Sequence, residues 1–117
     1  MIEIQSVEQW ESYIQSNKLV VAKFYTNWCK DCKRIDPFMP EVVDKFSQIQ
    51  FLSVDRDQFS ELGEQLNVFG IPSFVAFFGG KELIRFVSRE AKSQEEIESF
   101  MERTIQMVQA LEGRNSL

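Results

Sequence analysis

The chain contains two cysteines, Cys29 and Cys32, and only two residues separate them. They lie where an apolar run, residues 19–25, gives way to a segment whose apolar residues have helical spacing. A Cys-x-x-Cys pair at a strand-to-helix junction is typical of thiol–disulfide exchange. The start of a helix stabilises one sulfur as a thiolate, and the second sulfur can close a disulfide with it. The spacing therefore indicates redox chemistry.

Two other interpretations of the cysteine pair remain. A structural zinc ion needs four Cys or His ligands, and this chain has two cysteines and no histidine, so such a site could only be shared between chains. The pair could also be inert, since cysteine is often simply buried. The lack of histidine excludes Cys-His and Ser-His catalytic pairs. We predict no metal and no cofactor, with the pair itself as the redox group.

Composition limits the class of protein. A chain of 117 residues with 44% hydrophobic residues fits one domain with a modest core. The net charge of −5 argues against sequence-independent nucleic-acid binding, which needs a basic face. No apolar run reaches membrane-spanning length, and the first six residues lack the basic and apolar parts of a signal peptide. We predict a cytoplasmic monomer with no membrane or nucleic-acid partner.

The segments around the pair alternate between strand and helix patterns. Residues 2–4 read as a short strand, and Ser6 with Gln9 predicts a capped helix that ends near residues 17–18. The continuous apolar run at 19–25 predicts a strand covered on both faces, in which Lys23 is the anomaly. The next helix begins at Cys29.

Prolines and polar residues divide the middle of the chain. Pro37 should kink the helix that begins at Cys29, and Pro40 should break it. Residues 49–54 read as the next strand, and residues 55–57 as a loop and helix cap. A short helix follows, which Gly63 should weaken.

The C-terminal part predicts a hairpin and a last helix. A strand at 74–78, a Gly79-Gly80 turn and a strand at 83–87 form the hairpin, and Ser93 caps the final helix. We assign residues 1–112 to one domain and 113–117 to a polar tail. The predicted fold is α/β, with a mixed sheet flanked by helices on both faces.

Three motifs resemble those of the thioredoxin family, over nearly the whole chain. They are Trp28-Cys29-x-x-Cys32 after a buried strand, Pro37 in the helix that follows, and Gly70-Ile71-Pro72-Ser73, with Gly79-Gly80 between the last strands. The resemblance implies the thioredoxin fold and a redox-active disulfide. It also implies a thiol–disulfide oxidoreductase that reduces disulfides in partner proteins and takes part in electron transport and cell redox homeostasis. A thioredoxin reductase is the implied electron donor.

The resemblance also implies roles for single residues. Cys29 would be the exposed thiol that attacks a partner's disulfide, and Cys32 the more buried thiol that resolves the mixed disulfide. Trp28 would form one wall of the substrate groove. The bond between Ile71 and Pro72 would be cis, and the Ile71 backbone would pair with an extended stretch of the partner.

Four residues depart from the family's pattern. Lys30 and Asp31 stand where Gly-Pro is typical, and their effects on a Cys29 thiolate should partly cancel. Lys23 stands where many members carry a buried Asp; its amine either lies near Cys32 or snorkels to a sheet edge. Ser88 stands where a Gly is common. These departures keep an alternative open, a binding or adaptor module whose cysteines are secondary. A lesser one is an oxidant-detoxifying thiol protein.

Overall fold

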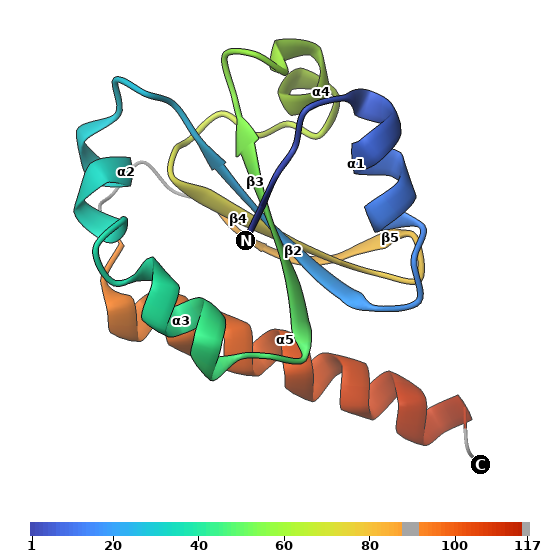
Figure 1. The fold of residues 1–117 in the computed structure, drawn as a ribbon. Helices are drawn as coiled ribbons and strands as arrows, with labels where there is room; N and C mark the ends of the chain where they lie inside the picture. The colour runs from blue at the N-terminus through green and yellow to red at the C-terminus, as the bar shows by residue number, and fades with distance from the viewer. Residues whose placement is uncertain (88–91, 116–117) are drawn as a thin grey trace.

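A five-stranded sheet with helices on both faces makes up the fold (Figure 1). The computed structural model describes residues 1–87 and 92–115. The elements in chain order are β1 (Ile2–Glu3), α1 (Val7–Ile14), β2 (Leu19–Tyr25), α2 (Lys30–Ile35), α3 (Met39–Lys45), β3 (Ile49–Asp55), α4 (Ser60–Gln65), β4 (Ser73–Phe78), β5 (Lys81–Phe86) and α5 (Gln94–Asn115). None of the described helices is both long and apolar enough to cross a membrane.

The strand order β1-β3-β2-β4-β5 brings distant parts of the chain to one edge of the sheet. β1, β3 and β2 are parallel, whereas β4 is antiparallel to β2 and β5 to β4. The mixed sheet predicted from the sequence is therefore confirmed. Because β2 and β3 end where β4 begins, the segments after Tyr25 and Asp55 and the segment before Ser73 leave the sheet at the same edge.

Each face of the sheet has its own core. Helices α2, α3 and α5 cover one face, and α1 and α4 cover the other (Figure 1). The central strand supplies both, since alternate residues of a strand point to opposite faces: Val21 packs under α2, α3 and α5, and Phe24 packs against Trp10 of α1. This two-sided burial explains why β2 is apolar almost throughout.

Two helices begin, and one hairpin turns, at the residues predicted from the sequence. The Gln9 N–H donates to Ser6 Oγ at 3.1 Å at the start of α1, and the Glu96 N–H donates to Ser93 Oγ at 3.1 Å at the start of α5. Gly79 and Gly80 turn the hairpin with φ of 63° and 81°, a region that favours glycine.

The helix after the cysteines is broken, as its two prolines predict. α2 ends at Ile35, before Pro37, which lacks the N–H that would continue the ladder. Pro40 lies in the first turn of α3, where backbone N–H groups have no partner within the helix, so a proline is tolerated. The cysteines therefore lie on a short separate helix.

Two predicted helix ends were wrong. α1 ends at Ile14 rather than near residues 17–18: Gln15 is the cap residue, and the Ser16 N–H donates to the Tyr13 carbonyl oxygen at 3.2 Å in a tighter turn. α5 continues through Asn115, so the first three residues assigned to the tail, 113–115, are helical. Glycine at 113 raises the cost of a helix but does not stop one that is already packed over several turns.

Gly63 in α4 has a packing reason. A Cβ added there would lie 2.2 Å from the Nε of Arg56. Arg56 donates to the carbonyl oxygens of Val68 at 2.8 Å and Ser60 at 3.1 Å, which ties the start and end of the α4 segment together. Gly63 therefore leaves the space that the Arg56 side chain needs to hold the α4 segment in place.

Candidate functional site

The two cysteines face each other across the first turn of α2. Cys29 is the residue that caps the helix, and its Sγ accepts a hydrogen bond from the Cys32 N–H at 3.1 Å. Both cysteines are free thiols. A sulfur that accepts a backbone N–H at a helix start is favoured as an anion. The arrangement keeps the two thiols within the same turn.

The prediction that Cys29 is exposed was wrong. It is 6% exposed and Cys32 is 3% exposed, so Cys32 is the more buried of the two by a small margin. The physical reason is the capping geometry, which turns the Cys29 sulfur back over the helix start and away from solvent. Any group that reacts with the Cys29 sulfur must therefore come close to the small part of this residue that is exposed.

The environment of Cys32 keeps its proton on. Burial, followed by the neighbouring Cys29 sulfur, raises the pKa of Cys32 to about 12. A hydrogen bond from the Thr26 backbone and the charge of Lys23 act in the opposite direction. At neutral pH Cys32 is therefore a thiol, and it has to lose a proton before it can attack.

Lys23 lies on the cysteine side of the sheet and is 8% exposed. Its Nζ is 3.7 Å from Asp36 Oδ1, at the end of α2, and 5.3 Å from the centroid of the Tyr25 ring. Asp36 is thus the carboxylate partner that the sequence could not identify. The charge of Lys23 contributes to lowering the pKa of Cys32, and its amine also reaches a carboxylate whose side chain is 59% exposed, so each of the two interpretations of Lys23 finds a contact.

The two residues between the cysteines differ in their surroundings. Lys30 is exposed, whereas Asp31 is partly buried and lies 3.3 Å from Arg34 Nη1. Arg34 therefore offsets part of the negative charge of Asp31, a pairing that was not predicted from the sequence.

The loop before β4 lies beside the cysteine loop. Ser73 pairs with Phe24 across β4 and β2, so residues 70–72 leave the sheet at the end of β2. The peptide bond between Ile71 and Pro72 is cis, as predicted, and the Ser73 hydroxyl donates to the Gly70 carbonyl within the loop. The structure therefore places the Gly70-Ile71-Pro72-Ser73 loop at the same edge of the sheet as the segment after β2 that holds Trp28, Cys29 and Cys32. Ser88, also singled out from the sequence, lies outside the described residues.

Trp28 has a partner that sequence reasoning missed. It is 69% exposed, and its indole Nε1–H donates to Asp57 Oδ2 at 2.8 Å. Residues 55–57 were predicted to be a loop and cap, and Asp55 does accept from the Asp57 and Gln58 N–H groups. The parallel pairing expected for these two strands could have indicated this contact. It brings the ends of β2 and β3 together, and Trp28 and Asp57 follow those ends.

Phe69 was also missed as a surface residue. Phe69 is 70% exposed and stands one residue before Gly70, in the loop that precedes β4, and nothing in the sequence singled it out. Two exposed aromatic side chains, Trp28 and Phe69, therefore lie in the segment that follows β2 and in the segment that precedes β4. Exposed aromatic side chains of this kind are typical of protein-binding surfaces.

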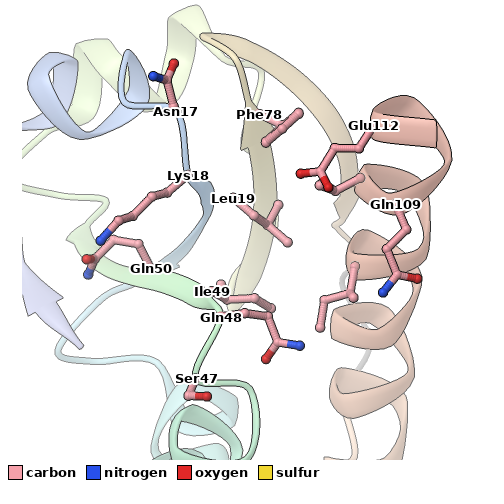
Figure 2. Close-up of a pocket in the computed structure, with 12 residues that line it drawn as sticks. Asn17, Lys18, Leu19, Ser47, Gln48, Ile49, Gln50, Phe78, Gln109 and Glu112 are labelled. Atoms are coloured by element: carbon pink, nitrogen blue, oxygen red, sulfur yellow. The ribbon is translucent and has the colours of Figure 1, made fainter. Parts of the chain in front are cut away.

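One hollow in the surface lies away from the cysteines. A cavity of about 550 Å³ opens between the starts of β2 and β3 and the C-terminal part of α5, where Gln109 and Glu112 face Leu19 and Phe78 (Figure 2). It is at the opposite end of β2 from the cysteines. Within residues 1–87 and 92–115 no group of three or more His, Cys, Asp or Glu side chains could hold a metal ion.

Comparison with known proteins gives the same family for sequence and structure. Residues 1–103 match the family model described as Thioredoxin. The chain is 30% identical over 90 residues to "Thioredoxin-2, mitochondrial" of Schizosaccharomyces pombe, covering 77% of this chain and 68% of that protein. It is 34% identical over 80 residues to thioredoxin 1 of Plasmodium falciparum, covering 68% and 77%.

A solved thioredoxin structure from Plasmodium falciparum superposes with a TM-score of 0.79 at 27% identity, over 88% of this chain and 98% of that one. A thioredoxin from Trypanosoma brucei brucei gives 0.77 at 25% identity, over 92% and 88%. The range that matches the family model, residues 1–103, includes all five strands and the segment that holds Cys29 and Cys32. The chain belongs to the thioredoxin family of thiol–disulfide oxidoreductases.

Proposed function

We propose that this chain reduces disulfide bonds in partner proteins, with Cys29 as the attacking thiol and Cys32 as the resolving thiol. The observation that carries the proposal is the hydrogen bond from the Cys32 N–H to the Cys29 sulfur at the start of α2. It favours the thiolate on Cys29, while burial keeps Cys32 protonated. Cys29 therefore attacks first, and Cys32 reacts only in the second step.

The reaction runs in two exchanges. The Cys29 thiolate attacks one sulfur of the partner's disulfide, and the other partner sulfur leaves as a thiolate and takes up a proton. Cys32 then loses its proton, attacks the Cys29 sulfur and releases the partner's second sulfur. The partner gains two electrons and the chain keeps a Cys29–Cys32 disulfide. No cofactor is needed, because the pair itself carries the electrons.

The surroundings of the pair suit an extended segment of a protein partner. Trp28 and Phe69 offer exposed rings, and the Ile71 backbone before Pro72 would pair with the partner's main chain. Lys30 and Asp31 form the charged rim next to Cys29. Asp57 holds the Trp28 ring in one orientation through its indole N–H, which lowers the cost of ordering it on binding.

The cellular setting follows from the direction of the reaction. A dithiol that must be reduced again after each cycle suits a reducing compartment, and we assign the chain to the cytoplasm as a monomer reduced by a thioredoxin reductase. One relative is named as mitochondrial. Cell fractionation with an antibody to the chain decides between the two compartments.

Replacing Cys32 by serine tests the order of attack. The Cys32→Ser variant, mixed with a disulfide-bearing protein such as insulin, should accumulate a mixed disulfide through Cys29 at close to one partner chain per molecule. The thiol that releases the partner is gone, so only added dithiothreitol should free it. Mass spectrometry of the non-reduced peptides identifies the linked cysteine.

The double variant Cys29→Ser, Cys32→Ser is the matched control. It should trap nothing under the same conditions. If Cys32→Ser also traps nothing, or if the double variant keeps the chain's full cellular role, the reductase proposal is wrong and the binding or adaptor alternative takes its place.

A further inference from the structure

The cavity between α5 and the starts of β2 and β3 has no part in the reaction described above. It opens where β2 begins, whereas the cysteines follow the end of that strand. Its volume is about 550 Å³ (Figure 2), and ligand sites in proteins usually measure about 300–1,000 Å³. The cavity is therefore large enough to hold a small organic molecule.

Apolar residues of the sheet form the floor of the cavity. Leu19 and Ile49 are the first residues of β2 and β3, pair with each other across the two strands, and are each 6% exposed. Phe78, the last residue of β4, lies beside Leu19 (Figure 2). Leu19 and Ile49 belong to the core on the α5 side of the sheet, and Phe78 packs against it. The floor is therefore the edge of this core, and the apolar part of a ligand can cover it.

The opposite wall belongs to the C-terminal half of α5. It consists of Ile105, Val108, Gln109 and Glu112, and the last three follow Ile105 by three, four and seven residues, so all four lie on one face of the helix. All four come after residue 103, where the match to the family model ends. The first half of α5 lies beside α3, and the second half continues past it (Figure 1). The wall is therefore built from a part of the chain that the family model does not cover.

The charge that faces the floor is negative. The Glu112 carboxylate points from α5 across the cavity, and the side-chain amides of Gln48 and Gln109 border the same gap (Figure 2). Lys18 also lines the cavity, but its ammonium group points away from α5 and toward Gln50 (Figure 2). Within residues 1–87 and 92–115, the Glu112 carboxylate has no ion-pair partner. A cation that enters the cavity can therefore pair with Glu112.

We propose that this cavity binds a small amphipathic amine, a molecule with an apolar body of one or two rings and a protonated amino group. The body covers Leu19 and Ile49, and the ammonium group pairs with Glu112. The amide oxygens of Gln48 and Gln109 can accept further N–H groups of the ligand. Burial of the apolar body supplies most of the affinity, because an ion pair that is open to water adds little. This site goes beyond the proposed function, since it lies away from the cysteines.

Tryptamine and indole-3-acetate are matched probes for this site, because they share the indole ring and carry opposite charges at neutral pH. Tryptamine added to the reduced, nitrogen-15-labelled chain should shift the backbone amide signals of the cavity residues until they saturate. Indole-3-acetate should bind about fivefold more weakly, which is the upper end of what an exposed ion pair contributes. The dissociation constants come from the shifts of the same amide signals in the two titrations.

Glu112→Gln separates the charge from the shape of the cavity. It should weaken tryptamine binding about fivefold and leave indole-3-acetate no weaker than before, since only the carboxylate is lost. The fold should survive, because position 112 is exposed and glutamine favours a helix about as much as glutamate does. Glu102→Gln is the matched control: it removes the same charge from the same helix at an exposed position outside the cavity, and it should leave both affinities unchanged.

Equal affinities for the two probes, an unchanged affinity in Glu112→Gln, or shifts confined to the residues around Trp28 would overturn the inference. So would cavity signals that move when the chain alone is diluted, because a second copy would then cover this face. Cavity signals that move when residues 116–117 are removed would overturn it as well, since the end of the chain would then occupy the site.

The same titration in the Cys29→Ser, Cys32→Ser variant keeps this inference separate from the proposed function. That variant has no thiol to exchange, and it should bind tryptamine with the affinity of the parent chain. Loss of binding in this variant would contradict a site that lies away from the cysteines. A failure of the Cys32→Ser trap leaves the tryptamine result standing, and an absence of tryptamine binding leaves the reductase proposal standing.

Discussion

Cys29→Ser should abolish disulfide reduction. With dithiothreitol as reductant and insulin as substrate, we expect the rate to fall by on the order of 10³-fold, to that of the reductant alone. The reason is that the sulfur favoured as a thiolate by the Cys32 N–H is lost, and Cys32, with a pKa raised to about 12, cannot replace it at neutral pH. The measurement is the initial rate of insulin precipitation.

Folding should survive this change, which makes the result easy to interpret. Serine is among the best residues for the position that caps a helix, so its hydroxyl can accept the Cys32 N–H in place of the sulfur. The midpoint of urea unfolding should therefore stay close to that of the reduced parent chain. If Cys29→Ser keeps more than about a tenth of the parent rate while folded, Cys29 is not the attacking thiol.

Phe24→Ala should be the most destabilising single substitution that leaves the cysteine chemistry in place. Phe24 is fully buried in the central strand, and its ring lies 6.0 Å from that of Trp10, centroid to centroid, in an edge-to-face contact. Removing a buried phenylalanine leaves a cavity and lowers the free energy of unfolding by about 3–5 kcal/mol. Urea denaturation at a fixed redox state measures the loss.

Phe69→Ala is the control for this substitution, since its ring is 70% exposed. It should change the free energy of unfolding by less than about 0.5 kcal/mol. Equal losses from the two variants would contradict the two-sided core described here, in which Phe24 and Trp10 hold α1 against the sheet.

Sequence reasoning found the features that depend on neighbouring residues. The strand that contains Val21 and Phe24, the cap at Ser6 and the turn at Gly79-Gly80 follow from local patterns, and each is confirmed. The broken helix followed in the same way, because a proline acts on its own turn.

The parts that were missed depend on contacts between distant segments. Asp57 accepts from Trp28 only because β2 and β3 end at the same edge of the sheet. Asp36 pairs with Lys23 only because α2 turns back over β2. The burial of Cys29 depends on how its sulfur rotates at the helix start, which a spacing pattern does not contain.

The central claim, a reversible dithiol–disulfide pair, is tested most directly by a redox titration of the unmodified chain. Samples equilibrated in dithiothreitol or glutathione buffers of increasing potential are quenched with acid, and their free thiols are counted by mass after alkylation. We predict a single two-electron transition from two free thiols to none, with the disulfide mapped to Cys29 and Cys32. Two thiols that stay free throughout, or one that only takes up glutathione, would contradict the account.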